Sequence, residues 1–309
     1  MNLALQGLMA KRRSIIPVTW TQQTSSFSTD LIYGVEYGSD GYWVATGAND
    51  KIASCTDPTG TWTQRTSNIT GFIYDSYYNG THWVIVGKDG YIATATDPTG
   101  TWTAKDLSGS FSPNAISVGW DGTYWTVAGS GGGLVTATDP TGTWTDRTSN
   151  LSGTIYGCLY ANSLWVIAGQ DDTNIATATN PTGTWTTRTN SFGTDLIYDI
   201  GYGDGYWVMV GAGGKMAYST DPTSGSFTQI TGGSNPFSGT IVWSVAYGDG
   251  IWVAVGAGGK LATTSDPTGT WTLQTSSFST DLIRQVRYGD EVWVAVGADG
   301  KLATAVNGL

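Results

Sequence analysis

The side chains that could catalyse a reaction or bind a metal are few in this 309-residue chain. His82 is the only histidine, and the two cysteines, Cys55 and Cys158, lie far apart in the sequence. One histidine with two distant thiols does not make an ordinary zinc site, and no Ser–His–Asp set can be identified. The acidic loop at Asp171 and Asp172 offers oxygen ligands for calcium, but such loops are usually solvated turns. We therefore expect no enzyme activity, no metal and no cofactor, and we expect both cysteines to be small buried hydrophobic residues.

Aromatic and charged side chains recur at one equivalent position of a repeated segment. The residues at this position are Tyr33, Tyr74, Ile116, Tyr156, Tyr198, Trp243 and Arg284. Three of the loops that precede it carry the same acid in an Asp-Leu-Ile sequence, at Asp30, Asp195 and Asp281. Aromatic faces beside carboxylates and arginines suit sugar rings. These residues, without Ile116, are the candidate ligand-binding ring.

The repeats that must position this ring are visible in two motifs. A Trp-Val-x-x-Gly segment, with Thr for Val in one copy, recurs at Trp43, Trp83, Trp125, Trp165, Trp207, Trp252 and Trp293. An Asp-Pro-Thr-Gly-Thr-Trp motif begins at Asp57, Asp97, Asp139 and Asp266, with degenerate copies at Asn180 and Asp221. Periods of about 40 residues are typical of propeller blades or of helical-pair solenoids. No segment carries an apolar stripe with a helical period, so propeller blades are favoured.

Each repeat contains four short runs of strand-forming residues separated by Gly, Asp and Pro turns. In the first repeat these runs are Leu31–Tyr37, Tyr42–Thr46, Lys51–Cys55 and Thr61–Arg65. Seven Trp segments but only six Asp-Pro-type turns are present, so the last blade lacks its outer strand. The segment Pro17–Phe27 matches Thr270–Phe278, and its Trp20 can complete the last blade. The sequence predicts an all-β, seven-bladed propeller of four-stranded antiparallel blades over residues 17–309, closed by an N-terminal strand.

The alignment of the innermost strands predicts which faces pack. Two positions after the candidate ring stand Val35, Ser76, Val118, Cys158, Ile200, Val245 and Val286, and four positions after it Tyr37, Tyr78, Trp120, Tyr160, Tyr202, Tyr247 and Tyr288. Because alternate residues share a strand face, most of the aromatic residues are expected to pack between blades, and only the uppermost ring is expected at the surface. Arg284 and Arg287 form a basic spot in the last blade that either binds an anion or neutralises Asp30 and Asp281.

The Asp-Pro-Thr-Gly-Thr-Trp turn resembles the Asp-box of BNR and sialidase-type propellers. Its glycine falls one residue later than in the usual box, at Gly60, Gly100 and Gly269. The resemblance implies a propeller, and it raises sialidase activity, for which three arginines must converge. Arg65, Arg147 and Arg188 follow the Asp-box tryptophan on the outermost strands of different blades. We therefore expect them at the rim, where they cannot converge.

Charge and the first residues limit the partners. The net charge of −10 and the pI of about 4.3 disfavour nucleic acids and anionic membranes. In residues 1–16, the apolar Leu3, Leu5, Leu8 and Met9 precede the basic run Lys11–Arg13, the reverse of a secretory signal. This segment is either a frayed terminus or an arm that docks on a partner.

The regular Trp252–Thr263 style of the repeats is similar to propeller domains of bacteriophage virion and tail-associated proteins. The leading prediction is a non-enzymatic virion protein, located on the capsid or tail, anchored to other virion proteins by its arm, with host surface glycan as a candidate ligand. The alternative is a free bacterial lectin-like or protein-binding propeller, and the third hypothesis is a sialidase-type glycoside hydrolase.

Overall fold

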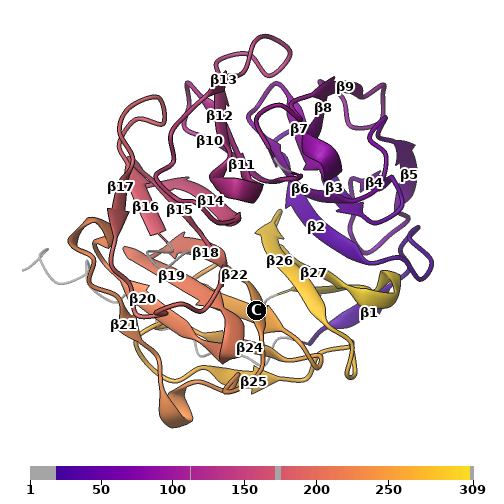
Figure 1. Cartoon of the computed structure of the whole chain (residues 1–309). Helices are drawn as coiled ribbons and strands as arrows, with labels where there is room; N and C mark the ends of the chain where they lie inside the picture. Colours follow the sequence, from indigo (N-terminus) through magenta and orange to yellow (C-terminus); the bar gives the residue numbers. More distant parts are fainter. Residues whose placement is uncertain (1–18, 112, 171–174, 307–309) are drawn as a thin grey trace, which may run out of the picture.

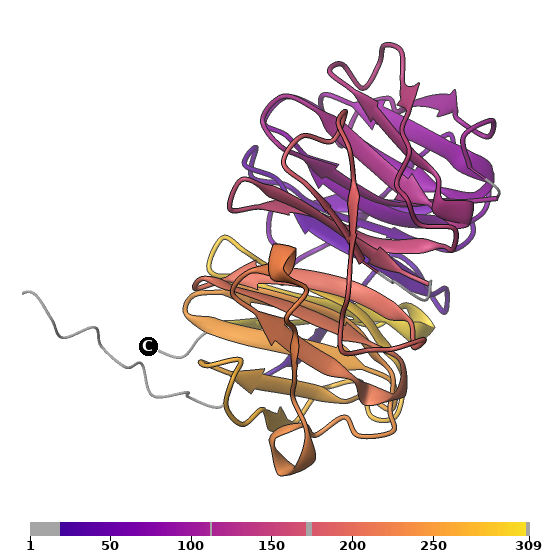
Figure 2. The ribbon, with the colours of Figure 1, turned by 60° about the vertical axis from the view of Figure 1, so that its left-hand side comes forward.

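Seven four-stranded antiparallel sheets surround a central channel in the computed structural model (Figure 1). The structure describes residues 19–111, 113–170 and 175–306. The predicted docking residues Leu3, Leu5, Leu8 and Met9, and the acidic pair Asp171 and Asp172, lie outside these ranges. Turned by 60°, the ring shows its sheets packed side by side around the axis (Figure 2). The predicted seven-bladed propeller is confirmed.

The strands are numbered along the chain, and each blade runs from the channel outward. Blades one to four are β2 (Ile32–Tyr37), β3 (Trp43–Gly47), β4 (Lys51–Cys55), β5 (Thr63–Thr66); β6 (Ile73–Tyr78), β7 (Trp83–Gly87), β8 (Tyr91–Ala95), β9 (Thr103–Asp106); β10 (Ala115–Trp120), β11 (Trp125–Gly129), β12 (Leu134–Ala137), β13 (Thr145–Asp146); and β14 (Ile155–Ala161), β15 (Leu164–Gly169), β16 (Ile175–Ala178), β17 (Thr186–Arg188).

Blades five to seven are β18 (Ile197–Gly203), β19 (Tyr206–Gly211), β20 (Met216–Ser219), β21 (Thr228–Gln229); β22 (Val242–Gly248), β23 (Ile251–Gly256), β24 (Leu261–Thr264), β25 (Thr272–Gln274); and β26 (Ile283–Gly289), β27 (Val292–Gly297), β28 (Leu302–Val306), β1 (Thr21–Gln23). Short 3-10 turns occur at Lys88–Gly90, Ser130–Gly132, Ala212–Gly214, Pro222–Ser224, Gly232–Ser234 and Ala298–Gly300.

The N-terminal strand closes the ring as the repeat count predicts. Strand β1 pairs antiparallel with β28, with Thr21 opposite Thr304 and Gln23 opposite Leu302. The Gln23 side-chain amide donates to Thr304 Oγ1 at 2.8 Å. Trp20 is buried in the same cluster as Trp293 of the last blade. The outer edge of β28 is therefore paired rather than left open.

The core lies between neighbouring blades. The seven tryptophans at the first or second position of the second strands are fully buried. Each packs against the aromatic residue near the end of the inner strand, with ring centroids 5.0 to 5.3 Å apart. These pairs are Tyr37–Trp43, Tyr78–Trp83, Trp120–Trp125, Tyr160–Trp165, Tyr202–Trp207, Tyr247–Trp252 and Tyr288–Trp293. The predicted burial of the cysteines is confirmed, because Cys55 and Cys158 are free and buried in these clusters.

The Asp-Pro turns join the third and outer strands of the blades. Asp57 Oδ1 accepts from the Thr59 backbone N–H at 2.9 Å and from its hydroxyl at 2.7 Å, and the Trp62 indole donates to the Pro58 carbonyl at 3.2 Å. The same three bonds form at the turns that begin at Asp97, Asp139 and Asn180. The motif therefore acts locally, as a turn that anchors its tryptophan.

Every inner strand contains a β-bulge, which the sequence prediction missed. The register with the second strand skips one residue in each blade, for example between Ile32 and Gly34. The skipped residues are Tyr33, Tyr74, Ile116, Tyr156, Tyr198, Trp243 and Arg284. The expectation that Tyr33, Val35 and Tyr37 share a face is wrong, because a bulge interrupts the alternation. Val35 and Tyr37 enter an inter-blade cluster, whereas Tyr33 lines the channel.

Candidate functional site

The seven bulge residues form a ring at one mouth of the channel. All seven are half-buried. Tyr33 and Tyr74 lie with ring centroids 5.2 Å apart, Tyr156 and Tyr198 5.3 Å apart, and Tyr198 and Trp243 4.4 Å apart. The structure thus brings together six of the predicted ligand-binding residues, with Ile116 as the seventh member. Below, this set is called the mouth ring.

Arg284 makes the mouth ring asymmetric. Its guanidinium carbon lies 4.7 Å from the Trp243 ring centroid, a cation–π contact. Burial lowers the pKa of Arg284, although nearby carboxylates oppose that effect. Within the described residues, the buried Trp243 Nε1 has no hydrogen-bond partner. Burial raises the pKa of Tyr74 to about 12, so its hydroxyl stays protonated and can donate. The mouth ring therefore presents donors and one cation among aromatic edges.

The three loop acids of the predicted site have another role. Lys51 pairs with Asp30 at 2.7 Å, Lys215 pairs with Asp195 at 2.7 Å, and Lys301 pairs with Asp281. Each lysine also donates to a backbone carbonyl, at Phe27, Phe192 and Phe278 respectively. None of the three acids lines the channel spaces formed by the described residues. These pairs fasten the loops beside the mouth ring, and lysines rather than Arg284 and Arg287 neutralise Asp30 and Asp281.

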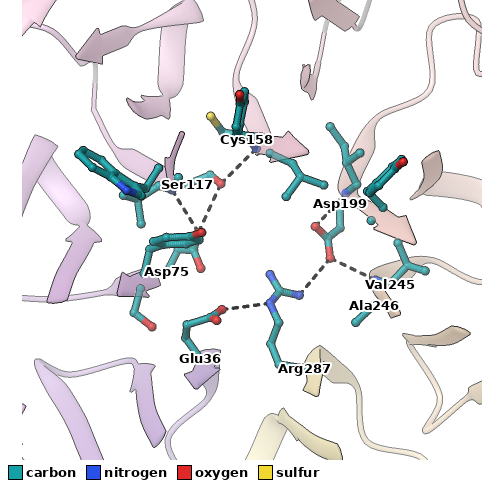
Figure 3. A pocket seen from close by; sticks show the side chains of 18 of the residues that line it. Glu36, Asp75, Ser117, Cys158, Asp199, Val245, Ala246 and Arg287 are labelled. Carbon is teal, nitrogen blue, oxygen red and sulfur yellow. Dashed lines mark hydrogen bonds and ion pairs between the residues drawn. The ribbon is translucent and has the colours of Figure 1, made fainter. Parts of the chain in front are cut away.

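Below the mouth ring, the residue after the bulge accepts a hydrogen bond from the next blade in five of the seven blades. Asp75 accepts from the Val118 N–H at 3.2 Å, Ser117 from Cys158 at 3.2 Å, Asp199 from Val245 at 3.1 Å, Ser244 from Val286 at 3.4 Å, and Gln285 from Val35 at 2.6 Å. Figure 3 shows three of these contacts. Hydrogen bonds that run in one direction around the channel therefore cross five of the seven boundaries between blades.

Glycine occupies this position in blades one and four. A Cβ at Gly34 would lie 2.7 Å from Thr46 Oγ1, so a side chain does not fit there. Asp75, in the following blade, accepts from its own neighbour Ser76 N–H as well as from Val118. Asp199, which follows Gly157, likewise accepts from Ile200 at 2.8 Å. Each aspartate thus accepts two backbone N–H groups, one in its own blade and one in the next blade. In the other blades the side chain of the preceding blade accepts the first of these N–H groups, but Gly34 and Gly157 have no side chain to do so.

Deeper in the channel, Arg287 lies between two carboxylates (Figure 3). Its Nε is 3.4 Å from Glu36 Oε2, and its Nη1 is 3.7 Å from Asp199 Oδ2. Burial raises the pKa of Glu36 to about 7, although Arg287 acts in the opposite direction. Burial also raises the pKa of Asp75. The alignment of positions 33, 35 and 37 missed these acids. Glu36 and Arg287 are the only charged residues in the aligned column one position before Tyr37, which could have indicated their pairing.

These groups line a cavity of about 240 Å³, and a second space of about 30 Å³ lies under the mouth ring. Asp75, Ser117, Asp199 and Arg287 line both spaces, so they form the floor between them. Aromatic walls come from Tyr77, Trp120, Tyr160, Tyr202 and Tyr247. Gly119, Gly201 and Ala246 contribute no bulk. We call this larger space the channel cavity.

The remaining candidates for chemistry are dispersed. Arg65, Arg147 and Arg188 lie on or next to the outer strands of three blades, and each Nε donates to a hydroxyl of its own blade at 2.8 to 2.9 Å. The predicted rim position of these arginines is confirmed. Within residues 19–111, 113–170 and 175–306, no group of three His, Cys, Asp or Glu side chains could hold a metal ion. The described part of the chain also contains no helix long and apolar enough to cross a membrane.

Comparison with known proteins supports the fold. No protein-family model matches the chain, and no curated protein matches its sequence. It is similar to the structure of YCF48 from Cyanidioschyzon merolae, with 15% identity, a TM-score of 0.75, and coverage of 93% of this chain and 98% of that one. It is also similar to YCF48 bound to D1 peptide, with 17% identity, a TM-score of 0.75, and coverage of 95% and 96%. The computationally designed Ika8 protein matches at 13% identity with a TM-score of 0.62, over 93% and 100% of the two chains.

Proposed function

We propose that this chain is a non-catalytic propeller that binds a segment of a protein partner at the mouth ring. The observation that carries the proposal is the half-buried ring of five aromatic side chains with Arg284 stacked on Trp243. Large aromatic residues and arginine are the side chains that dominate protein interfaces. The likeness in fold to a propeller whose structure is described as bound to D1 peptide supports this class of function.

A protein segment suits the mouth ring better than a sugar. Stacking on a sugar needs a free aromatic face. Tyr198 packs against both Tyr156 and Trp243, and Arg284 covers Trp243. What the ring offers is aromatic edges, tyrosine hydroxyls and the Arg284 cation. A segment with a ring side chain, carbonyl acceptors and an acidic residue complements these groups.

Selection from a random peptide library tests the proposal. Peptides are panned on the full chain and counter-selected on the variant Trp243→Ala/Arg284→Ala. We expect enriched peptides whose affinity falls about tenfold or more in Trp243→Ala. The matched control is Tyr91→Ala, which removes an exposed aromatic residue of β8. Equal binding to wild type and the double variant would contradict the proposal, as would binding on a glycan array that these substitutions abolish while no peptide is enriched.

The bacteriophage setting is a separate and finer proposal. It comes from the style of the repeats and from residues 1–16, which lie outside the described residues. None of the structures compared above is a virion protein. Deletion of residues 1–16 in the native gene context tests it, because a virion protein anchored by this arm would be lost from assembled particles. Unchanged incorporation would exclude anchoring by the arm.

A further inference from the structure

The cation of the mouth ring is not paired with a carboxylate of the described residues. The Arg284 guanidinium makes a cation–π contact with Trp243, but within that part of the chain it makes no hydrogen bond and no ion pair. The two acids in the floor below it already have other partners. Asp75 and Asp199 each accept a hydroxyl and a backbone N–H from the next blade. Arg284 therefore has donors left for an anion that comes from outside.

Tyrosine hydroxyls lie around this cation. Burial raises the pKa values of four tyrosines of the mouth ring, and the positive charge of Arg284 opposes that effect in each of them. Because Coulomb effects weaken with distance, the guanidinium must lie near all four side chains. These are Tyr33, Tyr74, Tyr156 and Tyr198. Their hydroxyls stay protonated at neutral pH, so they can donate hydrogen bonds next to the cation.

A second cation beside Trp243 lacks the acid that its counterparts have. In three other blades, the lysine eight residues after the second-strand tryptophan pairs with the aspartate of its own entry loop, as Lys51–Asp30, Lys215–Asp195 and Lys301–Asp281. In blade six, Thr240 stands in place of that aspartate. Lys260 donates to Thr240 Oγ1 at 3.0 Å and to the Pro236 carbonyl at 3.1 Å, and it pairs with no carboxylate of the described residues. The series is thus broken in the blade whose ring residue stacks on Arg284.

On the other side of Arg284, the mouth ring continues into an exposed aromatic residue. Tyr33 of blade one is the next ring member, and the Phe72 ring centroid lies 5.8 Å from that of Tyr33 and 6.2 Å from that of Tyr74. Phe72 is 38% exposed, although phenylalanine is usually buried. An apolar spot and two cations without acidic partners therefore lie along one arc of the mouth, from blade six to blade two.

We propose that the segment bound at the mouth ring carries an acidic side chain that binds Arg284 and is attracted by Lys260, close in sequence to an apolar residue that contacts Phe72. This inference rests on the proposed function, because it specifies the segment for the same site. A planar guanidinium matches a carboxylate through two parallel hydrogen bonds. A doubly charged phosphate suits the place less well, since Asp75 and Asp199 line the space below.

The peptides enriched on the full chain in the library selection test the inference through their sequences. We expect Asp or Glu close to an apolar residue, and only internal acids are selected because the peptides are joined to their carrier at the C-terminus. Each peptide is then synthesised as the C-terminal amide, with its acid or with the corresponding Asn or Gln. The loss of the acid should weaken binding to the wild type about ten- to hundred-fold, and to Arg284→Met about twofold or less.

The outcomes separate this inference from the proposed function. Enriched peptides without an acid, or equal losses in the wild type and Arg284→Met, would overturn the inference while the proposed function stands. Selection of no peptide would overturn both. A peptide that lacks the internal acid but ends in a free carboxylate tests the end of a chain as the source of the charge. Tighter binding of that peptide than of the acidic one would overturn the assignment to a side chain.

Thr240→Asp tests the second cation without removing any side chain of the mouth ring. It recreates the pair found in blades one, five and seven, so it should neutralise Lys260 and weaken binding of the acidic peptide about three- to fivefold. Thr240→Asn, which has nearly the same shape and no charge, is the matched control and should bind like the wild type. Equal affinities of the two variants would overturn the role of Lys260. If Arg284→Met does not fold, this comparison decides.

Two further substitutions place the apolar residue of the segment. Phe72→Ala should weaken binding of the enriched peptides about fivefold or more, because it removes an exposed aromatic contact. Leu273→Ala, which removes an exposed apolar side chain from the outer strand β25, is its control and should have no effect. Unchanged affinity in Phe72→Ala would overturn the apolar contact.

Discussion

Arg287 Nε of the last blade lies 3.4 Å from Glu36 Oε2 of the first blade. The two ends of the propeller are therefore joined twice, by the β1–β28 pairing at the outside and by an ion pair at the channel. Gln285, two residues before Arg287, adds a 2.6 Å hydrogen bond to the Val35 N–H across the same boundary. At the channel, the boundary between blades seven and one therefore has two polar contacts, the hydrogen bond from Val35 to Gln285 and the ion pair of Arg287 with Glu36.

Replacement of Arg287 with methionine should destabilise the fold. Glu36 and Asp199 would lose their shared cation, and unpaired acids in a poorly solvated space are unfavourable. The side chains of Arg287 and Glu36 are 25% and 22% exposed. We therefore expect a loss of about 2 kcal/mol in the free energy of unfolding, less than for a fully buried pair. Urea denaturation measures it, with Arg188→Met on the outer strand β17 as control. An equal loss in the two variants would contradict the assigned role of Arg287.

Stability should fall as the pH rises from about 4.5 to about 7. Glu36 has a pKa of about 7 in the folded chain against an ordinary 4.5, so the folded state holds a proton that the unfolded state releases. This contribution is complete below about pH 4.5 and is lost by about pH 7. The full shift corresponds to about 3 kcal/mol, and contact with cavity water should reduce this to about half.

Thermal unfolding at about pH 5 and pH 8 measures this dependence. Glu36→Gln should flatten it, and the slope that remains belongs to Asp75, whose pKa is also raised. A steeper dependence in Glu36→Gln than in the wild type would show that the sign is wrong.

Two deletions separate ring closure from the arm. Removal of residues 1–16 should leave the melting temperature unchanged, since the closing contacts begin at Trp20. Removal of residues 1–24 takes away the buried Trp20 and strand β1, and it leaves the edge of β28 unpaired. We expect the melting temperature to fall by at least about 6 °C, together with association of the chains. Calorimetry and light scattering after gel filtration measure both effects. Identical melting of the two deletion variants would contradict closure by β1.

The Asp turns should tolerate asparagine but not alanine. Asp97 Oδ1 bonds the Thr99 N–H at 2.8 Å, and Asn180 makes the equivalent bond to Thr182 at 2.9 Å. Asp97→Asn should therefore change the free energy of unfolding by less than about 0.5 kcal/mol, whereas Asp97→Ala should reduce it by about 1 kcal/mol. Urea denaturation compares the two. Equal losses would mean that the carboxylate charge, and not the hydrogen bonds, holds the turn.

The fold could be predicted because its signals are repeated. The spacing of the second-strand tryptophans gives the number of blades, and the match of the Trp20 segment to the Trp271 segment gives the closing strand. Both follow from local chemistry, since a turn or a buried indole needs the same residues wherever it occurs.

The channel lining was less predictable, because a β-bulge changes the direction in which the side chains of a strand point and no particular residue type marks its position. Gly34, Asp75, Ser117 and Gln285 all follow a bulge, and they share little as a sequence pattern. The prediction placed the mouth ring by its loops, but one of its two alternatives for Arg284 and Arg287, the neutralisation of Asp30 and Asp281, is wrong because lysines pair with those acids. Glu36 is separated from Arg287 by most of the chain, and only closure of the ring brings these two residues together.

Gly34 and Gly157 limit which blades of this propeller can be exchanged by protein engineering. Each is followed by a blade whose aspartate completes the bonding, so the repeats are alike in outline but not interchangeable. Exchanging blades two and three would place Ser117 after Gly34, and one hydroxyl cannot replace both carboxylate oxygens. Blades one with two, and four with five, are the units that an engineer could duplicate or transplant. A circular permutation, which keeps every neighbour, leaves this requirement satisfied.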